Sequence, residues 1–184
     1  MAYPTIIPVS GKARAGKDFF SALLAMELEN LGYYAQVIHY ATAVKRDCRI
    51  KFCWNGEKDE AGRSLLQWYG TDVIRHEKPN HWVEEAGRHF APNTDFVILP
   101  DTRFRNEIDY WRDKYPVVSI RLQRADNPES DLTDEQRKHR SETELDDYPF
   151  DHTLSIPHGI EHLEREAKRM ARVLTDRTTK ESAT

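Results

Sequence analysis

The sequence predicts an α/β fold built on a mainly parallel β-sheet of about five strands flanked by helices. Short apolar runs alternate along the chain with longer segments of helical spacing, which is typical of strand–helix–strand units. The run at 96–99 is apolar at every position, as expected for a strand covered on both faces of a parallel sheet. A glycine-rich turn at 11–16 joins an apolar strand to an amphipathic helix, which is the third indication of this class.

Composition restricts the class of protein further. The 184 residues, 39% hydrophobic and 32% charged, suit one domain, and no stretch approaches the ~20 apolar residues that a membrane helix needs. The N-terminus has no basic region before a long apolar run, and Cys48 and Cys53 do not form a disulfide framework or a CxxC pair. We therefore expect a cytoplasmic protein with reduced thiols. Its net charge of -4 argues against a nucleic-acid polymer as partner.

The first half of the chain contains two predicted strands, at 6–9 and 34–40, on either side of a helix over 17–31. Apolar residues at helical spacing define this helix, and Gly32 is suited to end it. The segment 42–90 departs from alternation because it is helical and polar, in several pieces.

Within this segment, two residues are predicted to mark the ends of helices. Gly70 is predicted to interrupt a helix, and Asn80 is predicted to cap the helix that carries Trp82.

The second half repeats the alternation. Strands are predicted at 96–99, 117–122 and 153–156. A helix between the first two carries Phe104, Ile108, Trp111 and Tyr115, and a last helix follows over 160–174. From Thr175 onward the tail is polar, and we expect it to fray.

A charged stretch at 126–147 separates the last two predicted strands. It has few apolar anchors and contains two capping-box patterns, which begin at Thr133 and Ser141. Both this stretch and the helical segment follow strands, and ligands of open α/β sheets bind at the carboxyl ends of strands. We therefore expect both to hold substrates.

The glycine-rich turn follows the GxxxxGK spacing of a P-loop, with aspartate where serine or threonine is usual. Its residues are Gly11, Lys12, Ala13, Arg14, Ala15, Gly16, Lys17 and Asp18. Glycines let successive N–H groups point into one concavity, where the next helix presents its positive end. This predicts binding of ATP phosphates, with Lys17 reaching the β- and γ-phosphates and Asp18 ligating Mg²⁺ directly or through water. A ligand-free turn is the alternative.

Asp101 ends the apolar run at 96–99, where a Walker-B-like carboxylate meets the metal shell. Beside a P-loop, this favours a second Mg²⁺ contact, directly or through water as for Asp18. The alternative is that Asp101 caps the next helix.

Arginines and lysines should surround a phosphoryl group in transfer. They occur in three clusters, of which two follow strands and the third lies in the charged stretch: Arg103 and Arg105, Arg121 and Arg124, and Arg137, Lys138 and Arg140. For the third cluster the alternative is a solvated run of charge. No Ser/His/Asp set is evident, as expected if the acceptor is a phosphate whose oxygen is already anionic.

Five segments occur in the order SGKARAGKDFF, LLQWYGTDVIRHE, HWVEE, DTRFRNEID and RKHRSETELDDYPFDHTL. From about residue 5 to residue 172, this pattern resembles the deoxynucleoside monophosphate kinases of bacteriophages and some bacteria. The resemblance implies a three-layer P-loop nucleoside monophosphate kinase fold. The GKD ending and the SETELD segment also resemble the animal type of phosphomevalonate kinase, which is a relative in the same superfamily.

The resemblance implies one kinase domain over 1–174 and a polar tail over 175–184. Its core would comprise 1–41, 91–125 and 151–174, with a monophosphate-binding insert at 42–90 and a lid at 126–150. The partners implied are MgATP and a deoxynucleoside monophosphate, in the host cytoplasm if the protein is viral. A homodimer is compatible with the resemblance.

The resemblance also implies roles for individual residues. Five residues of the insert would lie near the base, sugar or phosphate of the acceptor: Gln67, Thr71, Asp72, Arg75 and Trp82. Arg103 would contact the transferring group or the acceptor phosphate, and Glu107 would orient it. Arg137 and Arg140 would close over ATP, and residues 157–159 would lie beside adenine. Trp82 could equally be a packing residue, and Gln67 an exposed polar one.

These observations predict transfer of the γ-phosphoryl group of MgATP to a deoxynucleoside 5′-monophosphate. Two alternatives remain open. Phosphomevalonate could be the acceptor, or the chain could be a non-catalytic nucleotide switch. The absence of an NKxD element and the arginine-rich stretch argue against a switch.

Overall fold

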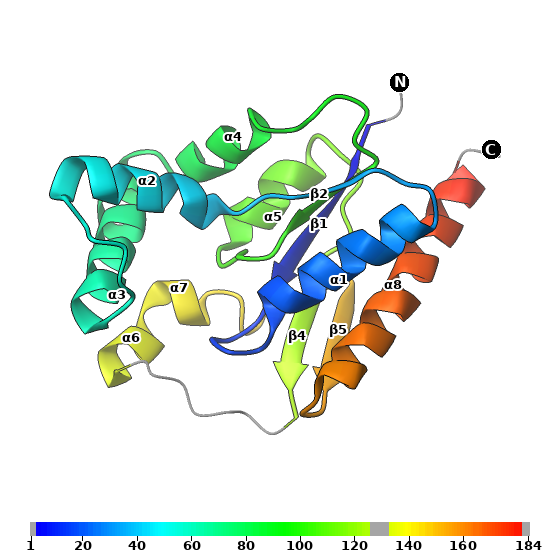
Figure 1. Cartoon of the computed structure of the whole chain (residues 1–184). Coiled ribbons are helices and arrows are strands. Elements are labelled where there is room, and N and C mark those ends of the chain that lie inside the picture. The colour runs from blue at the N-terminus through cyan, green and yellow to red at the C-terminus, as the bar shows by residue number, and fades with distance from the viewer. Residues whose placement is uncertain (1–2, 126–132, 182–184) are drawn as a thin grey trace.

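The computed structural model describes residues 3–125 and 133–181 and contains one five-stranded sheet (Figure 1). The strand order is β2-β3-β1-β4-β5, and every neighbouring pair is parallel. The strands are β1 (Thr5–Ser10), β2 (Ala35–Val37), β3 (Phe96–Leu99), β4 (Ile120–Arg124) and β5 (His152–Ile156). The predicted fold class is therefore confirmed.

Two helices cover one face of the sheet. They are α1 (Lys17–Asn30) and α8 (Ile160–Glu181), which pack along each other (Figure 1). Phe20, Leu24 and Met170 are fully buried between these helices and the strands. The helix α8 runs past Thr175 to Glu181, so the expectation that the chain frays from Thr175 is wrong.

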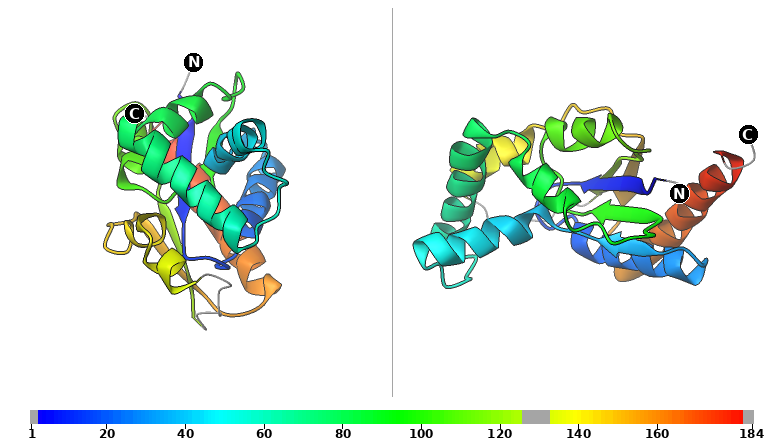
Figure 2. Two further views of the ribbon diagram at one scale, coloured as in Figure 1. Left: turned by 90° about the vertical axis from the view of Figure 1, so that its left-hand side faces the viewer. Right: turned by 90° about the horizontal axis from the view of Figure 1, so that it is seen from above.

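The opposite face carries a second apolar core. Here α2 (Tyr40–Phe52), α4 (His81–Gly87) and α5 (Arg105–Arg112) bury Trp82 and Trp111 against the sheet. The view from above shows the sheet between the two helical layers (Figure 2). The fold is therefore three-layered, as the resemblance implied.

The helical insert differs from the prediction at Gly70. The helix α3 (Glu60–Gln67) continues directly into the π-helix η1 (Trp68–Arg75), so Gly70 does not interrupt it. A Cβ atom at Gly70 would lie 3.2 Å from a methyl group of Val44, and the Trp82 indole donates to the Gly70 carbonyl at 2.9 Å. Close packing on both sides keeps this glycine inside the helix.

Asn80 precedes α4 as predicted, but its side chain makes no capping bond to that helix. Its Oδ1 instead accepts a hydrogen bond from the Asn106 side chain at 2.9 Å. This bond ties α4 to α5, so a tertiary contact has replaced the local cap.

Two strands are shifted relative to the prediction. The expected strand at 34–40 is only Ala35–Val37, because Tyr40 begins α2. The expected strand at 117–122 is Ile120–Arg124, and Val117 makes only an isolated bridge with Ile6.

Two short helices occupy the described part of the predicted lid: α6 (Asp134–Lys138) and α7 (Arg140–Thr143). The capping box at Thr133 is confirmed, with both reciprocal bonds to Gln136 at 3.2 Å. The one predicted at Ser141 is wrong, because Ser141 lies inside α7 and its N–H donates to His139 Nδ1 at 3.2 Å. Residues 126–132 of the predicted lid lie outside the described residues.

Among residues 3–125 and 133–181, the structure contains no helix with the length and apolar character needed to cross a membrane. The division of the chain into core, insert, lid and tail stays a prediction.

Candidate active site

The glycine-rich turn has the backbone that a phosphate-binding loop requires. Arg14 and Gly16 have positive φ angles of 62° and 87°, and Gly16 directly precedes α1. A Cβ atom at Gly11 would lie 2.6 Å from the Leu122 carbonyl oxygen, so any other residue there would clash. The turn therefore places its N–H groups and the start of a 14-residue helix at the carboxyl end of β1.

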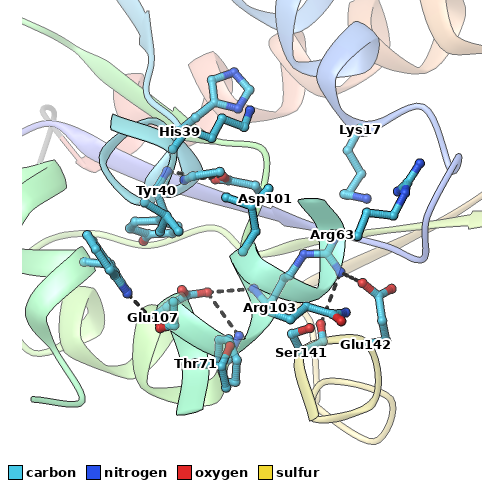
Figure 3. A pocket seen from close by; sticks show the side chains of 18 of the residues that line it. Lys17, His39, Tyr40, Arg63, Thr71, Asp101, Arg103, Glu107, Ser141 and Glu142 are labelled. Carbon is cyan, nitrogen blue, oxygen red and sulfur yellow. Dashed lines mark hydrogen bonds and ion pairs between the residues drawn. The ribbon is translucent and has the colours of Figure 1, made fainter. Parts of the chain in front are cut away.

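Lys17 points from the first turn of α1 into the space above this loop (Figure 3). Its Nζ donates to the Lys12 carbonyl at 3.0 Å. Burial, followed by the nearby Arg103 charge, lowers the pKa of Lys17 to about 8, while Glu142 and Asp18 oppose this shift. The amine is therefore still mostly charged near neutral pH, and added negative charge from a bound anion would raise its pKa.

This shift predicts pH-dependent nucleotide binding. Lys17 is charged below its pKa of about 8 and neutral above it, so MgADP affinity should fall about tenfold between pH 7 and pH 9. Binding at pH 9 should take up a proton, since the phosphates favour the charged amine. Calorimetry in two buffers of different ionisation enthalpy measures both effects. Lys17→Arg, which stays charged, should remove the dependence, and a flat wild-type profile would contradict the prediction.

A cavity of about 530 Å³ extends from the turn to the insert (Figure 3). This volume suits a small-molecule ligand. Its walls come from the turn, the insert, the segment after β3 and the helix α7. It brings together eleven of the residues predicted from the sequence: Arg14, Gly16, Lys17, Asp18, Gln67, Thr71, Arg75, Trp82, Asp101, Arg103 and Glu107.

Glu107 is the most buried charged residue of the site, with 1% of its surface exposed. Its carboxylate accepts hydrogen bonds from the backbone N–H groups of Arg103 (2.6 Å) and Phe104 (3.0 Å) and forms an ion pair with Arg75. Burial raises the pKa of Glu107, and the Arg75 guanidinium opposes this. Glu107 therefore fixes the backbone that presents Arg103 to the cavity.

Arg75 has unused hydrogen-bonding capacity. Its guanidinium lies 4.2 Å from the centre of the Phe104 ring and is paired with Glu107. Within the part of the chain that the structure describes, its buried Nη1 has no hydrogen-bond partner. A buried donor without a partner is costly, and an anionic ligand in the cavity would satisfy it.

Asp101 does not cap the next helix. Its carboxylate accepts from the N–H groups of Tyr40 (3.1 Å) and Ala41 (2.8 Å), at the start of α2. Across the described ranges, no three potential metal-ligating side chains gather in one place. Asp18 and Asp101 both line the cavity, and two carboxylates suit Mg²⁺, which keeps several waters and takes substrate phosphates as further ligands.

Seven predicted residues lie outside the cavity lining: four of the turn (Gly11, Lys12, Ala13 and Ala15), and Asp72, Arg137 and Arg140. Arg137 pairs with Asp134 at 3.4 Å, and Arg140 pairs with Glu144. Asp72 lies on η1, where its carboxylate is 3.6 Å from His139 Nε2. The roles implied for these residues stay predictions.

The other predicted residues frame the site. In the turn, Ala15 is buried, and Lys12 contacts α7 through the Glu142 carbonyl at 2.6 Å. After β5, His158 Nδ1 lies 2.8 Å from an Arg124 nitrogen, and a position beside adenine stays a prediction.

Four charged residues of the cavity lining were not predicted: Lys45, Lys58, Arg63 and Glu142. Arg63 projects into it from α3, one helical turn before Gln67, so i,i+4 spacing from Gln67 could have identified it (Figure 3). Glu142 contacts Arg103 from α7. No sequence signal distinguishes this glutamate from the other acidic residues of the charged stretch.

No protein-family model and no curated protein sequence matches the chain. Solved structures do match. An APS kinase mutant of Mycobacterium tuberculosis has a TM-score of 0.52 at 10% identity, over 95% of this chain and 99% of that one. The same enzyme in complex with AMPPNP and APS has a TM-score of 0.50 at 11% identity, over the same shares.

A gluconokinase from Sinorhizobium meliloti 1021 has a TM-score of 0.52 at 16% identity, over 99% of each chain. At sequence identities this low, structural similarity shows a shared fold and does not indicate a shared substrate. The parallel five-stranded sheet, the glycine-rich turn between β1 and α1 and these similarities together show that the chain has the fold of P-loop kinases.

Proposed function

We propose that this protein transfers the γ-phosphoryl group of MgATP to a deoxynucleoside 5′-monophosphate, forming the diphosphate and ADP. One observation carries the proposal. A single cavity of about 530 Å³ joins the phosphate-binding turn to a cationic and aromatic wall of the insert. Lys17 and Arg103 both line this cavity, so both could act on one transferring group.

The donor side of the cavity suits a triphosphate. The turn would hold its phosphates, and Lys17 would neutralise charge on the β- and γ-phosphates. Asp18 and Asp101 would hold Mg²⁺, which neutralises phosphate charge when bound.

The acceptor side combines positive charge with aromatic and amide groups, as a nucleotide requires. Arg75 has an unsatisfied N–H for a phosphate oxygen, and Arg63 adds a second guanidinium. Trp82 and Phe104 line the cavity with rings that are almost fully buried, 1% and 3% exposed, and the Gln67 side chain offers an amide to a base. The sequence resemblance supports the same acceptor.

This acceptor also fits the acid–base groups of the site. A phosphate oxygen is already anionic, so no residue must remove its proton. Asp101 accepts two backbone hydrogen bonds and Glu107 is saturated by Arg75 and two N–H groups. Transfer would therefore depend on positioning and on charge neutralisation by Lys17 and Arg103.

A coupled assay for ADP release tests the proposal. The acceptor panel comprises the four deoxynucleoside monophosphates, the matching ribonucleotides, phosphomevalonate and gluconate. We expect at least one deoxynucleotide to have the highest kcat/KM of the panel. Equal rates with all acceptors, or turnover of gluconate alone, would contradict this function.

Phosphomevalonate, or another small phosphorylated acceptor, is the second candidate. It is favoured by the cations that line the insert wall in addition to Arg75, namely Lys45, Lys58 and Arg63. The same panel separates it from a nucleotide. A homodimer stays a prediction.

A further inference from the structure

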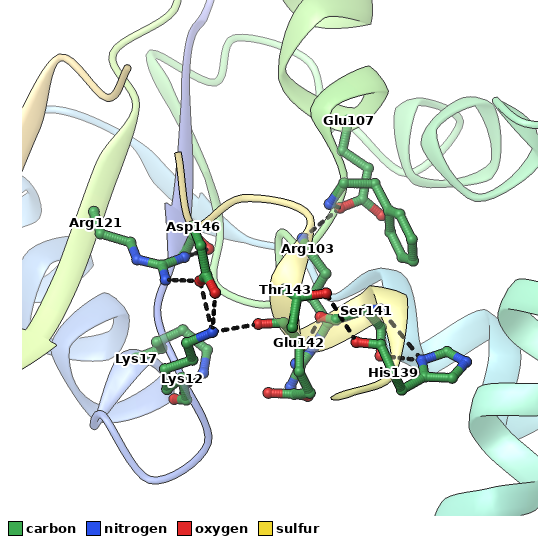
Figure 4. A network of polar contacts seen from close by, with 12 residues as sticks. Lys12, Lys17, Arg103, Glu107, Arg121, His139, Ser141, Glu142, Thr143 and Asp146 are labelled. Carbon is green, nitrogen blue, oxygen red and sulfur yellow. Dashed lines mark hydrogen bonds and ion pairs between the residues drawn. The ribbon is translucent and has the colours of Figure 1, made fainter. Parts of the chain in front are cut away.

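The guanidinium group of Arg103 is already bound to residues of α7, in the predicted lid (Figure 4). Its Nη1 forms an ion pair with the Glu142 carboxylate and donates to the Ser141 carbonyl at 3.2 Å. The Glu142 side chain is 7% exposed, whereas that of Arg103 is 30% exposed and lines the cavity. A buried carboxylate thus lies where the proposed function requires a phosphate oxygen.

The position of Glu142 is fixed by contacts between α7 and the phosphate-binding turn. Lys12 Nζ donates to the Glu142 carbonyl and to the Asp146 carboxylate, both at 2.6 Å. Asp146 also accepts from Arg121 Nη2 at 2.9 Å, and Arg121 Nη1 donates to the Ser10 hydroxyl at 3.0 Å (Figure 4). Hydrogen bonds and ion pairs from Lys12 and Arg121 therefore hold the segment that carries Glu142 in place beside Arg103.

We propose that Glu142 is a specificity-determining residue, an internal counter-ion that leaves Arg103 only when an acceptor adds its phosphate dianion to the donor phosphates, whose charge Lys17 and Mg²⁺ would already neutralise. This inference rests on the proposed function and restricts its acceptors to phosphorylated molecules. Water and neutral hydroxyl compounds would not free Arg103, so ATP would be spared from hydrolysis.

The difference in charge between a phosphate monoester and a hydroxyl group explains why only phosphorylated acceptors would displace Glu142. A phosphate monoester carries nearly two negative charges near neutral pH and three acceptor oxygens, whereas a carboxylate carries one charge. The dianion can therefore replace Glu142 at the guanidinium. A hydroxyl group cannot, because it would leave both the buried carboxylate and Arg103 without a charged partner.

The test is Glu142→Gln, with Glu135→Gln on the exposed face of α6 as the matched control. Glutamine keeps the shape of the side chain and removes its charge. Acceptor-free ATP hydrolysis should rise at least about tenfold, because Arg103 becomes available to the transition state. The KM for the best monophosphate should fall several-fold, and Glu135→Gln should match the wild type in both.

A second measurement does not depend on turnover. Calorimetric titration with inorganic phosphate should show several-fold tighter binding to Glu142→Gln than to Glu135→Gln. Glu142→Asp, which retains the charge on a shorter side chain, should fall between wild type and Glu142→Gln, and thermal unfolding checks that each variant is folded.

The outcomes separate this inference from the proposed function. If monophosphates are substrates but hydrolysis and phosphate affinity of Glu142→Gln equal those of the wild type, the inference is overturned. If Glu142→Gln loses transfer without gaining hydrolysis, Glu142 positions the lid and the inference is also overturned. If phosphate binds more tightly but no monophosphate is phosphorylated, the proposed function fails and the charge competition is supported.

Discussion

Lys17→Ala is expected to lower kcat by about three orders of magnitude, because preorganised charge at a transition state is worth factors of this size. Lys17 is the cation that projects from α1 into the cavity beside the phosphate-binding turn. The fold should remain intact. Burial lowers the pKa of Lys17 to about 8, so its charge opposes folding in the ligand-free protein.

Three measurements check this prediction: steady-state turnover with the best acceptor, calorimetric binding of MgADP, and the thermal unfolding midpoint. Lys168→Ala, on the exposed face of α8, is the control and should behave as wild type in all three. Near-normal turnover of Lys17→Ala would refute the proposed role of the turn.

Arg103→Ala is expected to lower kcat by a factor of about 10² to 10³ and also to destabilise the protein. The loss of stability follows from Glu142, which is 7% exposed and would lose its charged partner. An unsatisfied buried acceptor costs about 1–3 kcal/mol of unfolding free energy.

The double variant Arg103→Ala/Glu142→Gln separates the two effects. Removal of the orphaned charge should restore most of the unfolding free energy but none of the lost kcat, as measured by urea unfolding and by steady-state kinetics. If the double variant regained turnover, Arg103 would not act on the transferring group. If Arg103→Ala were as stable as the wild type, the ion pair would not contribute to stability.

Local pattern predicted much of the fold. The unbroken apolar run 96–99 is β3, which lies between β2 and β1, and the glycine-rich turn joins β1 to α1. The errors occur where tertiary contacts override local preference. A glycine usually breaks a helix, but Gly70 is retained inside α3–η1 by its packing against Val44 and its bond from Trp82.

The same reasoning applies to the candidate site. The turn and Asp101 were predictable because their spacing reflects a local geometry. Glu142 was not, because its partner Arg103 lies 39 residues earlier and an acidic residue in a charged stretch usually faces solvent. Only the folded chain brings these charges together.

Two hydrogen bonds from the start of α2 hold the Asp101 carboxylate at the carboxyl end of the sheet. Asp101 follows β3, and the phosphate-binding turn follows β1, the neighbouring strand. Adjacent strands lie about 4.8 Å apart in the hydrogen-bonding direction. The separation between Asp101 and the glycine-rich turn is therefore set by the pairing of β3 with β1.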